Sequence, residues 1–481
     1  MNQKHHTRVD VLFVNPPSPD GHVYIRDINR SGRRSREQTI WPQTSLAYLA
    51  AVVKNEGYTI DIIDCIAEEI SWNTFKEIIE LIIPKFVVIN VITSIVSNDL
   101  YTAFLGKYIN AATIAVGPHI SSLPEETLKR FPCLDCGIIG EAEITIKELI
   151  LNLDKEESLE QVKGLVYRDK NGDIQVNPER EFIENLDELP IPLHELLPVS
   201  KYRLPYIGSN YTFVLASRGC PFKCTFCRQP IMWKRQVRKR SAQSLFNELK
   251  YLNKIGINNI MFHADTFTID KGIVIELCNI IIREKLKVRW ICNSRVDTID
   301  SEMLVLMKKA GCWMIAYGIE SGSDQILQNV KKGEAATVAQ AKTAVLWTKK
   351  AGIKVWAYFI IGLPGENHDT VNKTIQLAKT ISADIVNFAV GAPYPGTELY
   401  DQARENKWLE SESWEKFDQN YSAILSFPGF SSDDTIQSIG LAYKKWYLRP
   451  SGFVSLLKGI NSWKDLRLLF RIGIEHLKIS K

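Results

Sequence analysis

The sequence lacks an apolar run long enough to cross a membrane. Its nearest candidate, IIELIIPKFVVINVI, is interrupted by Glu80, Pro84 and Lys85, whereas a transmembrane helix needs about 20 predominantly apolar residues. The first residues, MNQKHHTRVD, also lack the apolar segment of a secretory signal peptide. These two absences argue against a membrane-spanning or secreted protein, and we expect a cytoplasmic one.

Cysteine is scarce, and charge of one sign is nearly balanced by the other. The nine cysteines among 481 residues are an odd number, which argues against a disulfide framework and favours a reducing compartment. A net charge of +4 is too small to indicate a nucleic-acid-binding protein. With 45% hydrophobic residues, a chain of this length is expected to form two or three ordinary globular domains.

The first part of the chain alternates between strand and helix patterns. Short buried-strand runs are expected at 9–15, 58–64, 86–92, 112–117 and 134–140, with helical patterns between them. Such a series predicts a parallel, doubly wound sheet of the flavodoxin or Rossmann type, which binds ligands at the carboxyl ends of its strands. We assign this α/β domain to 1–150.

A different pattern follows in 151–205. The stretch GLVYRDKNGDIQVNPE indicates a hairpin around Asn171 and Gly172, and LDELPIPLHELLP is a linker punctuated by proline.

A second strand–helix series occupies 206–400. Its strands are expected near 211–217, 258–264, 288–294, 313–319, 354–361 and 384–391. Six units are too few for a closed eight-stranded barrel, so we predict a partial (β/α)6 barrel with its chemistry in the loops that follow the strands. A helical C-terminal region is expected over 401–481.

Three of the cysteines fall within one stretch, ASRGCPFKCTFCRQP, directly after the first strand of the second series. Cys220, Cys224 and Cys227 are three ligands, whereas a structural zinc site takes four. A redox C-x-x-C pair would leave Cys220 unexplained. A [4Fe–4S] cluster with one iron open to an outside ligand fits three thiolates best.

The spacing C-x-x-x-C-x-x-C, with the aromatic Phe226 before the last cysteine, resembles the radical S-adenosylmethionine superfamily. The segments HADTFTID, CNSRVD, GIESG, FIIGLPGE and PYPGTELY extend the resemblance over about 206–400. It implies that the open iron binds S-adenosylmethionine. The resemblance implies that this cofactor is contacted by Phe226, Asp265, Arg295, Glu320 and Gly362.

The sequence departs from this pattern at one position, and it leaves one alternative interpretation open. Ala264 occupies a position where the family commonly has an acidic residue, and Arg295 and Glu320 could instead pair with each other as a structural ion pair. Cys278, Cys292 and Cys312 lie in predicted helix or strand interiors and are expected to be core residues.

The first domain resembles the cobalamin-binding modules that precede some radical S-adenosylmethionine cores. The matching pieces are NPP at 15–17, VGPH at 116–119 and GEAE at 140–143. The glycines would permit close approach of a large flat ligand, and a serine after the third strand could donate a hydrogen bond to it. The expected cobalamin contacts are Asn15, Pro16, Ser94, Gly117, Gly140 and Glu141.

The histidine motif for a lower cobalt ligand, D-x-H-x-x-G, is only half present. Asp20 and His22 match it, but Ile25 stands where the glycine belongs. A rival family, the methylthiotransferases of transfer RNA, carries three cysteines in its first domain for a second cluster. This chain has Cys65, Cys133 and Cys136 there, although two of them fall in or beside strand runs.

Three basic segments carry further hypotheses. The stretches 26–37 and 233–240 are arginine-rich and would either face phosphates or form solvated surface. From 441 to 481 there are nine Lys and Arg residues against two acids. A helical stripe within 453–481 would either dock onto the protein or rest on an anionic membrane surface.

These patterns together favour a cobalamin-dependent radical S-adenosylmethionine enzyme that methylates an unactivated carbon. The resemblance implies that methylcobalamin donates the methyl group to a substrate radical made by a 5′-deoxyadenosyl radical. A cyclase or oxidase with the same cofactors is the alternative, followed by the methylthiotransferase and a non-catalytic cobalamin-binding protein. The expected partners are a small-molecule or lipid-like substrate and an electron donor such as flavodoxin or ferredoxin, with no nucleic acid.

Overall fold

The computed structural model describes residues 8–27, 30–36, 38–204, 208–332, 336–447 and 449. These residues divide into two compact units. Unit 1 comprises those within Met1–Ser35, Thr39–Leu204 and Arg228–Lys234, and unit 2 those within Arg36–Gln38, Pro205–Cys227 and Arg235–Lys481.

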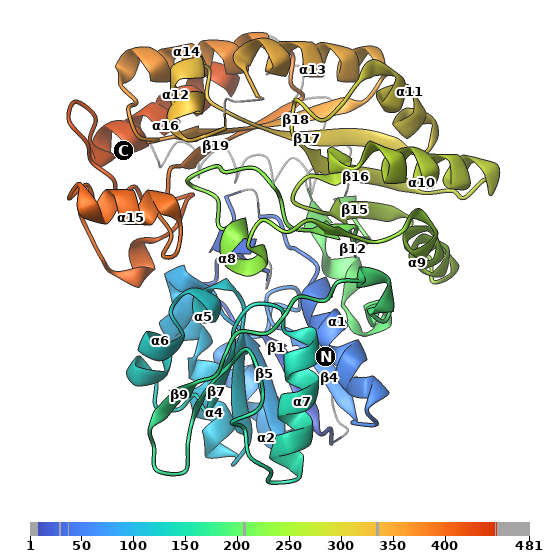
Figure 1. Cartoon of the computed structure of the whole chain (residues 1–481), viewed down its shortest axis with the longest axis vertical. Helices are drawn as coiled ribbons and strands as arrows, with labels where there is room; N and C mark the ends of the chain where they lie inside the picture. The colour runs from blue at the N-terminus through green and yellow to red at the C-terminus, as the bar shows by residue number, and fades with distance from the viewer. Residues whose placement is uncertain are drawn as a thin grey trace. The chain divides into compact units, whose positions relative to one another are not determined.

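Unit 1 is built on a seven-stranded sheet in the order β4-β1-β5-β6-β7-β8-β9 (Figure 1). Its strands are β1 (Val11–Asn15), β4 (Ile60–Asp64), β5 (Phe86–Asn90), β6 (Ala112–Val116), β7 (Cys136–Ile138), β8 (Leu165–Arg168) and β9 (Ile174–Val176). Its helices are α1 (Thr44–Asn55), α2 (Trp72–Ile82), α3 (Val96–Asp99), α4 (Tyr101–Tyr108), α5 (Pro118–Ser122), α6 (Pro124–Arg130), α7 (Glu143–Asp154) and α8 (Gln229–Trp233).

The first five of these strands pair in parallel, in the order expected for a flavodoxin-like sheet. Every residue of β1 and β5 is buried, as in a sheet that is covered on both faces. The predicted hairpin is present as β8 and β9, and it pairs antiparallel with β7, so it extends the sheet of unit 1.

Unit 2 is built on six parallel strands in the order β12-β15-β16-β17-β18-β19. The strands are β12 (Tyr211–Leu215), β15 (Asn259–His263), β16 (Arg289–Ser294), β17 (Cys312–Glu320), β18 (Lys354–Ile361) and β19 (Ile385–Val390). The helices are α9 (Ala242–Lys254), α10 (Lys271–Arg283), α11 (Ser301–Lys309), α12 (Asp324–Asn329), α13 (Val338–Lys350), α14 (His368–Thr380), α15 (Glu398–Glu405) and α16 (Ser432–Tyr447). Since β12 and β19 end the order without pairing with each other, the partial barrel is confirmed.

Short polar side chains begin the helices of unit 2. In five of these helices, the residue before the first turn accepts a hydrogen bond from a backbone N–H of that turn. These capping residues are Ser241 before α9, Asp270 before α10, Asp300 before α11, Thr337 before α13 and Asn367 before α14. These caps fix where each loop ends. The capped helices lie in chain order on one side of the six-stranded sheet (Figure 1). The loops after β15, β16 and β18 are therefore short, whereas the loop between β12 and α9, which carries the cysteines, extends over 216–241.

Each unit also contains a short two-stranded ribbon: β2 (Tyr24–Asp27) with β3 (Arg30–Arg34) in unit 1, and β13 (Ser217–Arg218) with β14 (Arg238–Lys239) in unit 2. Two further short strands are β10 (Arg203–Leu204) in unit 1 and β11 (Gly208–Ser209) in unit 2.

The two arginine-rich segments are buried in part: Lys234 and Lys239 of 233–240 are exposed, but two arginines of 26–37 lie in the protein interior. Arg26 is fully buried and pairs with Asp99 at 2.8 Å inside unit 1. Arg36, which belongs to unit 2, is buried and donates to the carbonyl of Phe388 at 3.1 Å. Burial of an arginine is tolerated where its charge finds a partner, as Arg26 does in Asp99. Nε and Nη2 of Arg36 have no hydrogen-bond partner among the described residues, and its guanidinium instead lies near the rings of Tyr421 and Tyr443.

Candidate active site

The three cysteines lie on the loop that follows β12. Cys224 is buried, and Cys220 and Cys227 are partly exposed. The backbone of the loop is fixed from two sides, because the N–H of Thr225 donates to the carbonyl of Val330 and its carbonyl accepts from the N–H of Leu399. The loop between the second and third cysteines is thus bound to the segment after α12 and to the start of α15.

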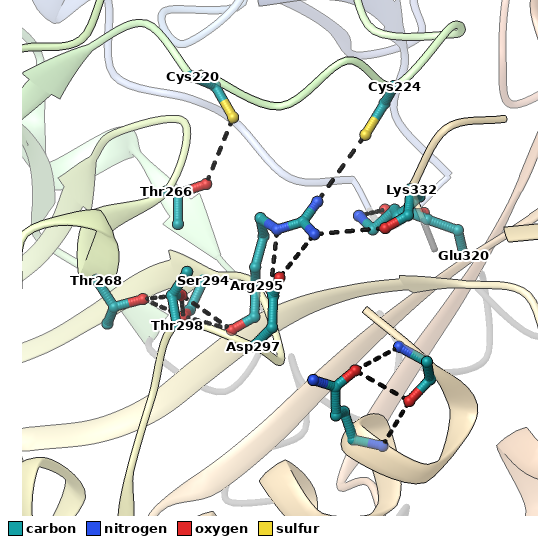
Figure 2. Close-up of polar contacts among 12 residues, drawn as sticks. Cys220, Cys224, Thr266, Thr268, Ser294, Arg295, Asp297, Thr298, Glu320 and Lys332 are labelled. Carbon is teal, nitrogen blue, oxygen red and sulfur yellow. Dashed lines mark hydrogen bonds and ion pairs between the residues drawn. The ribbon is translucent and has the colours of Figure 1, made fainter. Parts of the chain in front are cut away.

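Arg295 follows β16 and lies against this loop (Figure 2). Its Nη1 is 4.0 Å from Sγ of Cys224, and its Cζ lies 3.5 Å from the centre of the Phe222 ring. Nε and Nη2 each donate to the carboxylate of Asp297 at 2.9 Å. Burial by itself lowers the pKa of Arg295, but the hydrogen bond and charge of Asp297 outweigh this effect and raise the pKa above its ordinary value, so the guanidinium stays charged.

Glu320 ends β17 and pairs with Lys332 at 2.7 Å, with both side chains nearly buried (Figure 2). Its φ of 69° lies in the left-handed region, and the register of β17 against β18 shifts between Gly318 and Glu320. The interpretation that Arg295 and Glu320 pair with each other is therefore wrong, since each has a different partner. Lys332 has no signal in the sequence, because nothing in its spacing links it to Glu320.

Asp265 follows β15 and accepts a hydrogen bond from the backbone N–H of Gly219, at 2.9 Å. Next to it, the hydroxyl of Thr266 lies 3.9 Å from Sγ of Cys220. Ala264, where an acidic residue was expected by resemblance, is buried. The loop after β15 thus contacts the cysteine loop just before its first cysteine.

A group of three hydroxyl side chains lies beside Arg295 (Figure 2). Thr268 is 2.5 Å from Ser294 and 2.6 Å from Thr298, and Ser294 donates to the carbonyl of Arg295. These contacts connect the loops after β15 and β16 and help to orient Arg295. The sequence prediction missed them, since isolated Ser and Thr residues carry no distinctive pattern.

Phe226 and Gly362 lie in the same unit as the cysteines. Phe226 packs against a cluster formed by Ile326, Val330 and Leu363. Gly362 has a φ of 92°, and a Cβ placed there would lie 2.9 Å from Cγ2 of Thr435. Only glycine fits this turn without displacing α16.

The loop after Gly362 is closed by a buried carboxylate. Glu366 accepts the backbone N–H groups of Gly362 at 2.6 Å and Leu363 at 3.1 Å. Burial raises the pKa of Glu366 to about 7, and its Oε1 has no hydrogen-bond partner among the described residues.

In unit 1, Asn15 lies at the carboxyl end of β1. Its amide donates to Asp64 at 2.6 Å and accepts from Arg26 at 3.3 Å. Burial raises the pKa of Asp64 to about 6. The hydrogen bond between Asn15 and Asp64 joins the carboxyl ends of β1 and β4. Pro16 is also buried.

Ser94 is the cobalamin candidate with an unsatisfied polar atom. It is 5% exposed, and its Oγ has no hydrogen-bond partner among the described residues. A buried hydroxyl without a partner is costly, so it fits a site that a polar ligand would complete.

The remaining candidates differ in their surroundings. Gly117 has a φ of 118°, and a Cβ there would lie 2.9 Å from the carbonyl oxygen of Val91. Nothing lies within 4 Å of a Cβ placed at Gly140, although its backbone N–H donates to Oγ of Ser121 at 3.0 Å. Glu141 is buried and accepts the backbone N–H of Ile183 at 2.8 Å, so it also has a structural role.

His22 does not offer its Nε2 to a metal ion. Arg34 Nη2 lies 2.6 Å from this nitrogen and can only donate to it. Asp20, the other half of the motif, accepts the backbone N–H of His22 and the hydroxyl of Tyr24.

The cysteines of the first domain cannot share a cluster. Cys65 follows β4, whereas Cys136 begins β7, and the sheet places four strand spacings between these strands. At roughly 4.8 Å per spacing, β4 and β7 lie about 19 Å apart, which is too far for their cysteines to bind one cluster. Cys278, Cys292 and Cys312 are buried in unit 2, as expected for core residues.

Across the described part of the chain, no three Cys, His, Asp or Glu side chains converge closely enough for a single metal ion. A [4Fe–4S] cluster binds its thiolates through different iron atoms and spaces them farther apart, so three cysteines on one loop fit it. No described helix has the length and apolar character needed to cross a bilayer.

Comparisons with known proteins agree with this arrangement. The family model "Radical SAM superfamily" matches residues 214–378, and "B12 binding domain" matches 36–150. An uncharacterized methyltransferase of Pyrococcus horikoshii is 36% identical over 86% of this chain and 89% of its own length. The anaerobic magnesium-protoporphyrin IX monomethyl ester cyclase of Rubrivivax gelatinosus is 29% identical over 92% of this chain and 78% of its own.

Among solved structures, the radical S-adenosylmethionine methyltransferase TsrM of Kitasatospora setae, with cobalamin and a [4Fe–4S] cluster bound, shares the fold. The TM-score is 0.70 at 15% identity, covering 98% of this chain and 99% of that one. From the long 36% identical relative and the two family domains on one chain, the protein belongs to the radical S-adenosylmethionine superfamily, in the cobalamin-dependent branch that uses a [4Fe–4S] cluster, S-adenosylmethionine and cobalamin.

Proposed function

We propose that the protein transfers a methyl group to an unactivated carbon of a small or lipid-like molecule. The observation that carries the proposal is the cysteine loop after β12, with Arg295 and Asp265 beside it, on a chain that also has a cobalamin-binding domain. When bound, the cofactors supply the electron, the radical and the methyl group. The residues of this chain bind, orient and shield them.

The site residues divide into three groups in this proposal. Cys220, Cys224 and Cys227 ligate the cluster. Phe226, Asp265, Arg295, Glu320 and Gly362 contact S-adenosylmethionine from the loops after different strands. Asn15, Pro16, Ser94, Gly117, Gly140 and Glu141 contact cobalamin at the carboxyl edge of the first sheet. The domain boundaries in this proposal are 1–150 for the cobalamin-binding domain, 151–205 for the hairpin and linker, 206–400 for the radical core and 401–481 for the helical C-terminal region.

The partners are proposed on chemical grounds. The cluster needs one-electron donation, and a flavodoxin or ferredoxin in the cytoplasm would provide it. Peripheral contact with the inner face of a membrane through 453–481 would bring a lipid-like substrate within reach. That segment lies outside the described residues, so the proposal rests on its basic, amphipathic sequence alone.

The first experiment is anaerobic reconstitution with iron, sulfide and hydroxocobalamin. We expect about four irons and one cobalt per chain, and 5′-deoxyadenosine formation with a reductant. Cys224→Ala should abolish nucleoside formation, whereas the matched core variant Cys278→Ala should keep it. Absence of cobalt from the wild-type protein would contradict methyl transfer by this route. Four irons retained in Cys224→Ala would contradict the ligand assignment.

A cyclase or oxidase is the second candidate, favoured by the similarity to the Rubrivivax gelatinosus cyclase over most of this chain. The two activities differ in product mass. A product heavier than the substrate by one methylene group supports methyl transfer, while a product lighter by two hydrogens supports ring formation or oxidation.

A further inference from the structure

Arg295 contacts the cysteine loop at two points. Its Nη1 lies 4.0 Å from Sγ of Cys224, and its planar face lies 3.5 Å from the centre of the Phe222 ring. Phe222 stands between the first two cysteines of the loop. Arg295 is only 5% exposed and Cys224 8% exposed, so water screens this contact weakly.

The guanidinium is oriented by Asp297 rather than by the sulfur. Asp297 accepts from Nε and Nη2, both at 2.9 Å, and both side chains are 6% exposed. The fork of the guanidinium is therefore occupied on one side, and Nη1 is left on the side of Cys224 (Figure 2). The carbonyl of Lys332 lies 3.5 Å from Nη2 and fixes the same orientation.

We propose that Arg295, oriented by Asp297, raises the reduction potential of the cluster through the Cys224 sulfur. This inference rests on the proposed function and on Cys224 as a ligand. Reduction adds one electron, supplied by an external donor, and so adds one negative charge to the cluster and its thiolates. A neighbouring buried cation and an N–H directed at the sulfur stabilise that charge, and both are known to set cluster potentials.

The test is an anaerobic redox titration of the reconstituted full-length protein. The amount of reduced cluster at each potential is measured from its electron paramagnetic resonance signal. The titration is done without S-adenosylmethionine. We expect Arg295→Gln to lower the ratio of reduced to oxidised cluster at a fixed potential by about tenfold, which is about 59 mV for a one-electron couple. Arg295→Lys keeps the charge without the fork and should shift the potential less.

Asp297→Asn provides a test of sign. It removes the negative charge that offsets Arg295, so the reduced cluster should become more favoured and the potential should rise. A role that is merely structural would not move the two variants in opposite directions. The matched control is Arg289→Gln, which removes an arginine from the opposite end of β16, about 20 Å along the strand from Arg295.

The outcomes separate this inference from the function on which it rests. Opposite shifts in Arg295→Gln and Asp297→Asn, with Arg289→Gln unchanged, support it. Equal potentials in wild type and Arg295→Gln, or shifts of one sign in both variants, overturn it. If Arg295→Gln assembles no cluster, an unchanged or lower potential in Asp297→Asn overturns it. A wild-type protein without a cluster would instead contradict the proposed function itself.

Discussion

At the scale of single residues, the charged side chains near the cysteine loop form local pairs. Arg295 pairs with Asp297 and Lys332 with Glu320, and all four side chains are nearly buried. Burying a charge without a partner costs several kcal/mol, so each pair allows a polar group to remain at the carboxyl end of a strand.

Substitution of Lys332 tests how much its pairing with Glu320 contributes to stability. We expect Lys332→Met to destabilise unit 2 by about 3–5 kcal/mol, because Glu320 is left as an unpaired buried charge. The double variant Glu320→Gln/Lys332→Met should lose less unfolding free energy, because no unpaired charge remains. Urea unfolding measures the loss in both variants.

The control for this prediction is the neighbouring lysine. Lys331 pairs with Glu398 at the surface, where both side chains are more than a third exposed. Lys331→Met should therefore cost less than about 1 kcal/mol. Equal losses for the two lysines would contradict the buried-pair interpretation.

Glu366 predicts a pH dependence of stability. Because burial raises its folded pKa to about 7, above the ordinary value of a glutamate, the folded state binds the proton more tightly than the unfolded state. Its contribution is present at low pH and is lost as the pH rises from about 5 through 7. The full shift corresponds to about 3 kcal/mol.

Glu366→Gln keeps the acceptor for the two backbone N–H groups but cannot titrate. We expect its unfolding free energy to lack the decline predicted for wild type between about pH 5 and 7. Glu405→Gln, at the exposed end of α15, should retain that decline. A parallel decline in Glu366→Gln would show that another group causes it.

At the scale of elements, the loop that carries the cysteines is fixed by its neighbours. Thr225 is bonded through its backbone to Val330 and to Leu399, which belong to the segment after α12 and to α15. The turn at Gly362 contacts Thr435 of α16. The site loops are thus bound to helices from the last third of the chain.

Gly362→Ala tests the contact between this turn and α16. The substitution adds strain at a φ of 92° and places Cβ 2.9 Å from Thr435, so we expect a loss of about 2–3 kcal/mol in unfolding free energy. Gly256→Ala has a similar φ of 85° but open space around it, and it should cost about 1 kcal/mol. Adding Thr435→Ser to Gly362→Ala should recover part of the difference. No recovery would mean that backbone strain alone explains the loss.

At the scale of the whole molecule, the described residues form two units of different architecture, and the proposed function assigns cobalamin to unit 1 and the cluster to unit 2. Unit 1 has the doubly wound sheet and the Ser94 hydroxyl, which has no hydrogen-bond partner among the described residues, and unit 2 has the open six-stranded sheet with the cysteine loop. Each sheet offers its site at the carboxyl ends of parallel strands, where the loops are free to vary.

The basic C-terminal segment gives a prediction at this scale. Deleting 453–481 should abolish binding to vesicles that contain anionic lipid, because this segment carries much of the chain's excess positive charge. Iron and cobalt content and the far-ultraviolet circular dichroism of the remainder should be retained. Unchanged vesicle binding after the deletion would contradict a membrane role for this segment.

The amino-acid sequence by itself determined the parallel sheets, the open barrel and the cysteine loop. These follow from local signals: hydrophobic runs bounded by glycine and capping residues, and three cysteines at fixed spacing. Spacing and resemblance also placed Arg295 and Glu320 at the ends of their strands.

Only the tertiary structure decided which groups these residues contact. Asp297 and Lys332 became the partners of Arg295 and Glu320, and Arg26 found a buried carboxylate in Asp99. The sequence does not show which partner a charged residue has, because that partner depends on how segments far apart in the chain are brought together. The same is true of Cys65 and Cys136, which the strand order separates although the sequence allowed them to share a cluster.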